Sequence, residues 1–185
     1  MMRFLLRIAF LLLVVWLLWM MFGPAVTPPT VPDLPERPDL TQQPIQGNID
    51  RILIEKSARR LSVWQGGNLV REYRIRLGFA PDGDKVRQGD GKTPEGVFRV
   101  DRRNNRSQFH LSLGIDYPQE DDRIRARKGG YNPGGDIFIH GQPNQIRDGY
   151  QIRGDWTEGC IAIDNSQIEE LFAATPIGAK VEIRP

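Results

Sequence analysis

Beyond residue 50, hydrophobic and polar positions alternate in short segments, a pattern typical of β-strands. Three such segments follow one another at residues 51–55, 60–64 and 69–77. The last two are separated by Gln65-Gly66-Gly67-Asn68, which supplies residues that readily take the positive φ angles of a hairpin turn. We therefore predict a three-stranded antiparallel meander. Further strands are expected at residues 96–99, 108–113, 136–140 and 180–183.

Helical periodicity is expected in only one or two short segments. The clearest one follows residue 165, where Ser166 and Glu169 form the pattern of a capping box and Pro176 ends the helix. Its apolar face consists of Ile168, Leu171 and Phe172. Residues 80–94 and 116–135 are rich in glycine, proline and charge, so we predict long loops there, which in a compact domain are usually functional.

The N-terminus has a different pattern, with an unbroken apolar run at residues 8–22 that residues 4–6 extend. Counted from Phe4, the run approaches the roughly 20 residues that cross a bilayer. Arg3 and Arg7 precede it and acidic residues follow, which predicts a cytoplasmic N-terminus. We expect residues 1–22 to be a single-pass anchor in the cytoplasmic membrane, with the rest in the periplasm. A cleaved signal peptide is the alternative, and it too exports the domain.

Residues 23–47 contain seven prolines and few aliphatic side chains. Proline at this density favours an extended, semi-rigid chain, so this segment is predicted to be a spacer between the membrane and a domain at residues 48–185. A proline-rich ligand for a partner domain is the alternative interpretation.

Charge and composition narrow the class of function. The chain has 25 basic and 23 acidic residues, and the excess disappears once Arg3 and Arg7 are set aside. The folded part therefore has no excess of basic residues, which argues against a nucleic-acid partner. The two histidines and single cysteine have no spacing that would supply several ligands from one element, so no metal and no other cofactor is expected.

The single cysteine, Cys160, is the best candidate for chemistry. A thiol acts as a nucleophile only as its thiolate, so it requires a base and open space for the acyl group. Gly159 provides space, and its backbone amide and that of Cys160 could stabilise an oxyanion. His140 ends a predicted strand and is the expected general base, oriented by the backbone at Gly141.

Each residue alone also has an ordinary structural explanation, because buried cysteines are commonly inert and strand-end histidines commonly hydrogen-bonded. Their joint occurrence in glycine-flanked motifs favours an enzyme over a catalytically silent wall-binding module. His110 lies in an apolar β segment and is predicted to be structural.

These motifs resemble the catalytic domain of the YkuD-type L,D-transpeptidases, in which a strand-end His-Gly is followed about twenty residues later by Ser/Thr-x-Gly-Cys-Ile/Val. Here the corresponding residues are His140-Gly141 and Thr157-Glu158-Gly159-Cys160-Ile161. Two further stretches, residues 89–96 (GDGKTPEG) and 109–114 (FHLSLG), are similar to the YafK-like murein transpeptidase branch.

The resemblance implies a mostly β fold, a YkuD-like β-sandwich or barrel with one or two short helices, preceded here by the transmembrane helix. It also implies an acyltransferase that acts on peptidoglycan stem peptides. Cys160 would attack the third stem residue, expel the terminal D-alanine and hold a thioester, while His140 transfers protons. The acceptor could be an amine of another stem, giving a 3-3 cross-link, an amine of a wall-attached protein, or water, which would make the enzyme a hydrolytic L,D-peptidase or amidase.

One position departs from the family pattern. Many members have arginine directly after Cys-Ile/Val, where this chain has Ala162. Substitutes for that cation could be Arg153, Arg147 or the basic run Arg123, Arg125, Arg127 and Lys128, although a solvated loop is the expected role of the run. Candidates for substrate contacts are Thr157, Trp156, Arg153 and Tyr131.

Overall fold

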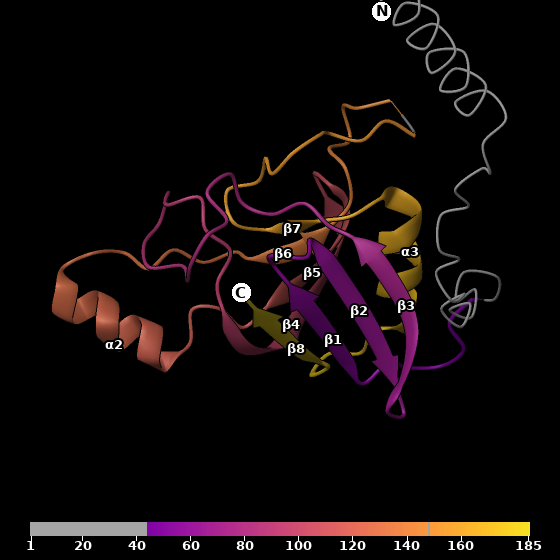
Figure 1. Cartoon of the computed structure of the whole chain (residues 1–185), viewed down its shortest axis with the longest axis horizontal. Helices are drawn as coiled ribbons and strands as arrows, with labels where there is room; N and C mark the ends of the chain where they lie inside the picture. Colours follow the sequence, from indigo (N-terminus) through magenta and orange to yellow (C-terminus); the bar gives the residue numbers. More distant parts are fainter. Residues whose placement is uncertain (1–43, 148) are drawn as a thin grey trace, which may run out of the picture. The chain divides into compact units, whose positions relative to one another are not determined.

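The computed structural model of the chain describes residues 44–147 and 149–185 (Figure 1). These residues belong to one compact unit, Asp39–Pro185. The predicted anchor and nearly all of the predicted spacer lie outside the described residues. No helix within the described ranges is long and apolar enough to cross a membrane.

The predicted meander is confirmed. Strands β1 (Arg51–Glu55), β2 (Arg60–Gln65) and β3 (Asn68–Arg74) pair antiparallel in sequence order. The β2–β3 turn has φ values of 57° at Gly66 and 82° at Gly67, the left-handed conformation that glycine adopts without strain.

The order of the strands in the sheet differs from their order in the sequence. Strand β8 (Lys180–Arg184), the last in sequence, inserts beside β1 in parallel and pairs antiparallel with β4 (Gly96–Ser107) on its other side. Strands β5 (His110–Ile115), β6 (Phe138–His140) and β7 (Ile161–Ala162) complete one eight-stranded sheet, in the order β3-β2-β1-β8-β4-β5-β6-β7.

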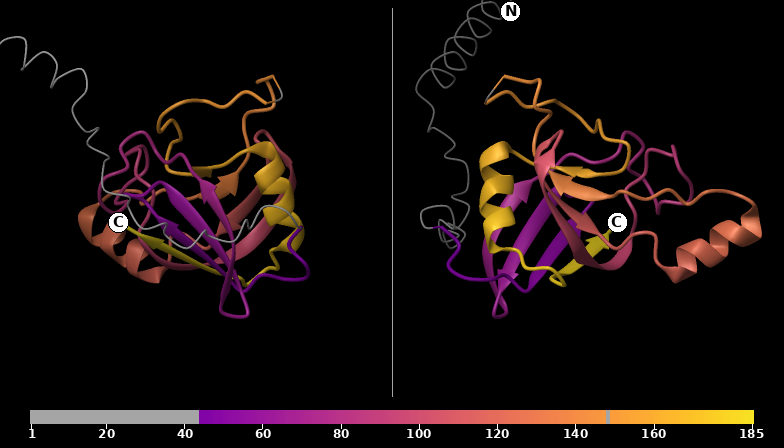
Figure 2. Two further views of the ribbon diagram at one scale, coloured as in Figure 1. Left: turned by 45° about the vertical axis from the view of Figure 1, so that its right-hand side comes forward. Right: turned by 180° about the vertical axis from the view of Figure 1, so that it is seen from behind.

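The sheet curls so that its two edges approach each other. After β3 the chain continues to Arg76, which bridges Ala162 of β7, and Gly78 bridges Thr157. The mostly β fold is therefore confirmed in the form of a half-barrel made from one curled sheet, in place of two separate packed sheets (Figures 1 and 2).

Two strands differ from the prediction. β4 runs through Asp101–Ser107, a charged stretch that resembles a loop, because alternate side chains there face solvent while the backbone pairs with β5. β7 has only two residues and was not predicted, since a strand this short has no periodicity.

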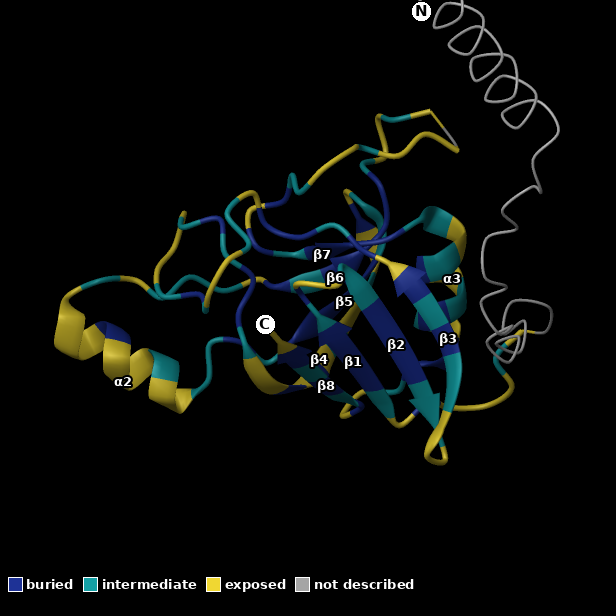
Figure 3. Cartoon of the chain, in the orientation of Figure 1, coloured by how far each residue is buried: buried dark blue, intermediate teal, exposed yellow. Residues whose placement is uncertain are grey.

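Helix α3 (Asn165–Ala174) confirms the predicted helix and packs against β5 and β6. Its capping box is formed by Asp164 and Gln167, two residues before the predicted pair. Ile168, Leu171 and Ala174 are buried against the sheet, and the surrounding core appears as the dark strands in Figure 3.

Helix α2 (Glu120–Gly129) corrects the prediction of a loop at residues 116–135. Only Ala126 is buried in it, so no apolar stripe marks the helix in the sequence (Figure 3). Its stability comes from local signals: acidic residues in the first turn, basic residues in the last turn, a Gln119–Asp122 capping box and Gly130 in the left-handed conformation at the C-cap.

Candidate active site

Cys160 lies at the end of an ordered turn that leads into β7. Asp155 fixes the beginning of this turn, since its Oδ1 accepts a hydrogen bond from Leu77 N at 2.9 Å and its Oδ2 lies 2.8 Å from Arg59. Thr157 fixes the end, donating from Oγ1 to the carbonyl of Cys160 at 2.7 Å. The sulfur therefore sits on a backbone held at both ends.

Gly159 is required by the geometry of this turn. Its φ is 131°, and a Cβ at this position would lie 2.6 Å from the carbonyl oxygen of Lys92. The turn thus packs directly against the loop at residues 80–95, with no room for a side chain between them.

His140 ends β6 and is 3% exposed. Its Nδ1 lies 2.7 Å from the carbonyl oxygen of Gly141, which fits a tautomer with the proton on Nδ1 and leaves Nε2 as an acceptor. The Phe109 ring lies 4.5 Å from the imidazole centroid, and the Trp156 ring packs against it edge-on at 5.7 Å. The ring is therefore oriented by the backbone and shielded by two aromatic side chains.

Cys160 and His140 line the same pocket, which has a volume of about 390 Å³. The rest of its lining comes from β4, the turn between β4 and β5, β5, and the segment that leads into β6: Asn104, Arg106, Ser107, Gln108, Phe109, Ser112, Asp136 and Phe138. A second pocket, of about 620 Å³, also reaches Cys160 but does not include His140. The thiol thus lies between two recesses, only one of which contains the histidine.

Both titratable groups are neutral at pH 7. Burial lowers the pKa of His140 to about 4, although its hydrogen bond to Gly141 opposes this effect. Burial also raises the pKa of the Cys160 thiol to about 11, and the Asp136 carboxylate adds to this while the Phe138 amide, Lys85 and Arg102 oppose it. The site at rest therefore holds a neutral imidazole and a thiol, whose Sγ donates to the carbonyl oxygen of Asp136 at 3.4 Å and accepts from Phe138 N at 3.4 Å.

The two backbone amides predicted as oxyanion donors, those of Gly159 and Cys160, differ in whether they already make a hydrogen bond. Gly159 N donates to Thr157 Oγ1 at 3.2 Å, so its predicted role as an oxyanion donor requires that bond to be shared or released. No acceptor for the Cys160 amide is found among the described residues. Its amide is the better placed of the two predicted donors.

The loop that contains the GDGKTPEG stretch supplies Lys85, Gln88 and Gly89 to the wall of the second pocket. The Asp90 carboxylate accepts hydrogen bonds from the backbone amides of Val86, Arg87 and Lys92 and from Lys85 Nζ at 2.7 Å. Thr93 is fully buried, and its hydroxyl accepts a hydrogen bond from Gly78 N at 3.3 Å. These contacts fold the loop onto the segment that closes the sheet, next to Cys160.

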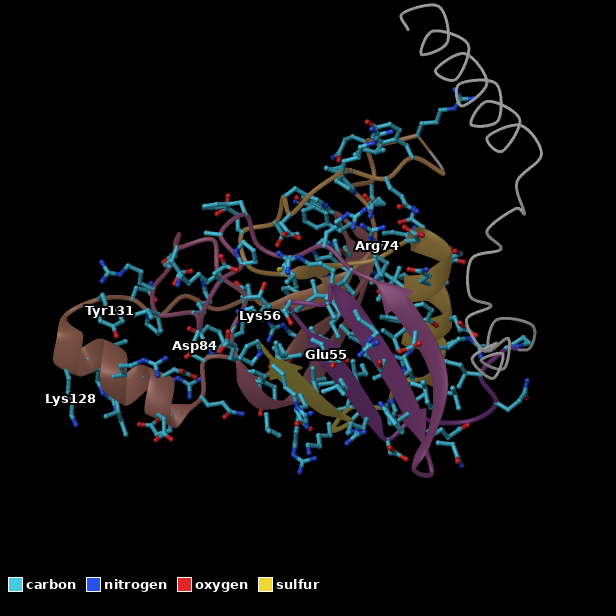
Figure 4. All side chains as sticks on the ribbon, viewed as in Figure 1. Glu55, Lys56, Arg74, Asp84, Lys128 and Tyr131 are labelled. Carbon is cyan, nitrogen blue, oxygen red and sulfur yellow. The ribbon has the colours of Figure 1, made fainter. Side chains whose placement is uncertain are left out.

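The predicted substrate contacts are distributed unevenly. Thr157 is buried, and its hydroxyl bonds within the turn, donating to the Cys160 carbonyl and accepting from the Gly159 amide. It therefore holds the backbone of Cys160 and does not face a pocket. Trp156 packs on His140, whereas Arg153 is exposed and lines neither pocket. Tyr131 lies beyond the end of α2 (Figure 4), where the Arg87 guanidinium carbon is 5.4 Å from its ring centroid, and it lines neither pocket.

Ala162 is fully buried and pairs with His140 across β6 and β7. The suggested substitutes for the family arginine lie elsewhere, because the basic run is on α2 and Arg147 is exposed without lining either pocket. The cations that line the two pockets are Arg106 and Lys85, which the sequence did not single out.

His110 occupies a separate site. It has a φ of 64°, and its Nε2 lies 2.6 Å from Glu169 Oε1 on α3. It lines neither of the two pockets at Cys160. Its contacts join β5 to α3, which agrees with the structural role predicted for it.

The family model of the L,D-transpeptidase catalytic domain, YkuD, matches residues 49–183, which is nearly all of the described unit. The chain belongs to this family. YafK, an Escherichia coli (strain K12) protein that carries the name of an L,D-transpeptidase, is 29% identical over 137 residues, 71% of this chain and 49% of YafK. The chain thus spans about half the length of the curated relatives it matches.

Solved structures agree with this family assignment. The helical cell shape determining protein Pgp2 from Campylobacter jejuni superposes with a TM-score of 0.58 and 26% identity over 75% of this chain and 48% of that protein. Bd1075 of Bdellovibrio bacteriovorus shares the fold with a TM-score of 0.53 and 23% identity, covering 75% of this chain and 48% of its own. As a YkuD-family domain, the chain has the general scaffold of an acyltransferase.

Within the described ranges, no group of three or more histidine, cysteine and acidic side chains could hold a metal ion.

Several residues at the site were missed by sequence reasoning. Phe109 and Phe138 were inside predicted strands, where an aromatic residue usually indicates core. Lys85 was inside a stretch recognised only as a long loop. The adjacent motif at residues 89–96 was singled out by its resemblance to the YafK-like branch, and nothing local indicated which side chain the loop would present to Cys160.

Proposed function

We propose that this protein is a cysteine-dependent L,D-transpeptidase that acts on peptidoglycan tetrapeptide stems. The observation that carries the proposal is that Cys160 and His140 line one pocket, with the imidazole oriented by Gly141 so that Nε2 is free to accept a proton. Membership of the YkuD family supplies the class of reaction.

In the first half of the reaction, Cys160 Sγ attacks the carbonyl carbon of the third stem residue while its proton passes to His140 Nε2. The Cys160 amide stabilises the oxyanion. The carbon–nitrogen bond to the terminal D-alanine then breaks, and the imidazolium returns the proton to the leaving amine. A thioester between Cys160 and the tripeptide remains.

In the second half, an acceptor attacks the thioester and gives its proton to His140. An amine of another stem produces a 3-3 cross-link, an amine of a wall-attached protein produces an anchored protein, and water releases a free tripeptide. All three outcomes restore the thiol. The choice among them depends on which acceptor occupies the pocket shared with His140.

The protonation states determine how the reaction begins. Because burial lowers the pKa of His140 to about 4 and raises that of Cys160 to about 11, the thiolate is not preformed at neutral pH. The proton must move when the substrate carbonyl is in place. Activity is therefore expected to fall as pH drops through about 4, where the base becomes protonated.

The test is incubation of the full-length protein with disaccharide-tetrapeptide, followed by mass spectrometry. Loss of one alanine should accompany a cross-linked dimer or a free tripeptide, and Cys160→Ala should abolish both. An intact substrate, together with the absence of a covalent carbapenem adduct, would refute the enzymatic proposal and favour a non-catalytic wall-binding module. Repeating the incubation with and without an added amine distinguishes transfer from hydrolysis.

We extend the proposal to the location of the domain. Residues 1–22 would hold the chain in the cytoplasmic membrane with residues 48–185 in the periplasm, where the peptidoglycan is found. Protease treatment of spheroplasts should then digest the domain, whereas a cytoplasmic domain would be protected. Since Pgp2 is a cell shape determinant, altered cell shape after deletion of the gene is a further expected outcome.

A further inference from the structure

A row of three residues crosses the sheet close to Cys160. Arg102 of β4 pairs with Gly114 of β5, and Gly114 pairs with Phe138 of β6, so the three lie on neighbouring strands (Figure 1). Residues that are directly paired in an antiparallel sheet project to the same face. The middle residue of the row has no side chain, which leaves space over β5.

The Arg102 side chain fills this space. A Cβ at Gly114 would lie 2.5 Å from Arg102 Cγ and 2.8 Å from its Nε. The guanidinium carbon lies 4.5 Å from the centroid of the Phe138 ring, where a cation is attracted to the ring face. Nη1 also donates to Asp101 Oδ2 at 2.8 Å. Arg102 therefore crosses β5, reaches β6 and is held at several points on the way.

The far end of Arg102 binds Asp136, which precedes β6. Its Nη2 donates to Asp136 Oδ1 at 3.0 Å, and both side chains are exposed. Exposed ion pairs usually contribute little, because ordering two side chains costs entropy. Here the guanidinium is already ordered by its contacts with Gly114, Phe138 and Asp101. The pair can therefore restrain Asp136 at a smaller entropic cost than an ordinary surface pair.

The backbone of Asp136 requires such a restraint. Its φ is 53°, in the left-handed region, which is unfavourable for a residue with a Cβ and persists where surrounding contacts hold it. Gly134 and Gly135 precede it and have no side chains that could anchor this segment. Among the described residues, Arg102 is the only hydrogen-bond or ion-pair partner of the Asp136 side chain.

The Asp136 backbone in turn holds the nucleophile. Cys160 Sγ donates to the Asp136 carbonyl oxygen at 3.4 Å and accepts from Phe138 N at 3.4 Å. Asp136 and Cys160 are also the two residues that line both pockets at the sulfur. A change in the φ of Asp136 would redirect the carbonyl that the thiol binds and so move the sulfur relative to His140.

We propose that Arg102 is a positioning residue, which holds Asp136 in its left-handed conformation so that the Asp136 carbonyl fixes Cys160 Sγ between the two pockets. Arg102 lines neither pocket, so it acts through Asp136 and not on the substrate. This inference rests on the proposed function and adds a residue of β4 to those on which the first half of the reaction depends.

The competing explanation is a direct effect of charge. Burial is the main cause of the raised pKa of the Cys160 thiol, while the Asp136 carboxylate raises this pKa further and Arg102 lowers it. The Arg102 charge would act on the thiol whether or not Asp136 is present, whereas the restraint acts only through Asp136. The two explanations therefore predict different results when both residues are substituted.

The test is single-turnover release of alanine from disaccharide-tetrapeptide by the full-length protein and its variants. Arg102→Met should lower the maximal rate constant about tenfold, since displacing a catalytic group by about 1 Å can cost about 100-fold. The stem concentration that gives half of this rate should change by less than about twofold, because substrate binding is not affected.

Two further variants separate restraint from charge. In an Asp136→Gly background, Arg102→Met should cost less than about twofold, since glycine takes the left-handed conformation without a restraint. Gly114→Ala keeps the Arg102 charge but places a methyl group 2.5 Å from Arg102 Cγ, so it should reproduce the loss seen in Arg102→Met. A tenfold loss that persists in the Asp136→Gly background, or a full rate in Gly114→Ala, would overturn the inference.

Arg103→Met is the matched control. Arg103 follows Arg102 on β4 and projects to the opposite face, where its guanidinium carbon lies 4.2 Å from the centroid of the Phe172 ring. The variant removes an equal charge and a similar aromatic contact and should keep the rate within about twofold. An equal loss in Arg103→Met, or a full rate in Arg102→Met, would overturn the inference and leave the proposed function intact. No release of alanine by the unsubstituted protein would refute the proposed function itself.

Discussion

The two histidines of this chain lie on neighbouring strands and have opposite surroundings. His140 is 3% exposed, packed against Phe109 and Trp156, and its only hydrogen bond from a ring nitrogen within the described residues is to its own backbone at Gly141. The His110 side chain is 34% exposed, and its Nε2 lies 2.6 Å from Glu169 Oε1. A general base for the thiol needs a free ring nitrogen in the pocket of Cys160, and of the two histidines His140 provides one.

Gly141 separates the two environments. Its amide lies 3.1 Å from the carbonyl oxygen of Phe109 and 3.3 Å from that of Leu111, on either side of His110. A Cβ at Gly141 would lie 2.6 Å from Asn165 Oδ1 and 3.1 Å from the Cβ of His110. The backbone that orients His140 is therefore packed directly on the structural site of His110.

The largest effect is expected on kcat when His140, the proposed general base, is substituted. His140→Gln should lower kcat by about 10²- to 10⁴-fold, the usual contribution of general acid–base catalysis. His110→Gln is the matched control and should keep kcat within about twofold, since the His110 side chain lines neither Cys160 pocket and its Nε2 contacts Glu169. The measurement is single-turnover release of alanine from disaccharide-tetrapeptide. Equal losses in both variants would mean that the two histidines act as one unit.

The next largest effect is expected from Gly141→Ala. The added methyl group would lie 2.6 Å from Asn165 Oδ1 and 3.1 Å from the Cβ of His110, so either these side chains or the backbone that orients His140 must shift. We expect a loss of about 100-fold in kcat, the scale of a displacement of about 1 Å in a catalytic group, and about 1–3 kcal/mol in the free energy of unfolding from overpacking. Unchanged kcat in a destabilised variant would show that this backbone can relax without moving the imidazole.

The pH dependence of stability should distinguish the buried histidine. Burial lowers the pKa of His140 to about 4, so between about pH 6.5 and pH 4 the unfolded chain binds a proton that the folded chain does not. Acidification over this range should cost about 2–3 kcal/mol of unfolding free energy. Denaturant titrations of the full-length protein at several pH values would measure this loss.

The control for the pH experiment is again the exchange of one histidine at a time. His140→Gln should remove most of the loss between pH 6.5 and pH 4, whereas His110→Gln should retain it. A loss of full size in the His140 variant would assign the titration to another group.

The smallest effect is expected at the His110–Glu169 pair. Both side chains are substantially exposed, so Glu169→Gln should change the unfolding free energy by less than about 1 kcal/mol, and less still at high salt. A thermal denaturation series at two salt concentrations measures this change. A large loss would indicate that the pair holds α3 against β5 more firmly than an exposed ion pair normally can.

Much of the fold was predictable because the signals are local. Alternation and a Gly-Gly turn specify β1–β3, and apolar spacing with Pro176 specifies α3. Helix α2 was missed because a helix stabilised by caps and ion pairs has no apolar stripe. The insertion of β8 between β1 and β4 was not predictable, since it joins segments from opposite ends of the domain.

The sequence by itself determined the chemistry that the protein can carry: one thiol, a strand-end histidine, and glycines where a side chain would block the turn at Cys160. These depend on residue types and on neighbours in the chain. Only the tertiary structure decided that burial keeps the imidazole neutral, that Gly159 donates its amide to Thr157, and that Lys85 lines a pocket at the sulfur. Burial, electrostatics and unused hydrogen-bond donors depend on segments far apart in the chain, and no local pattern records them.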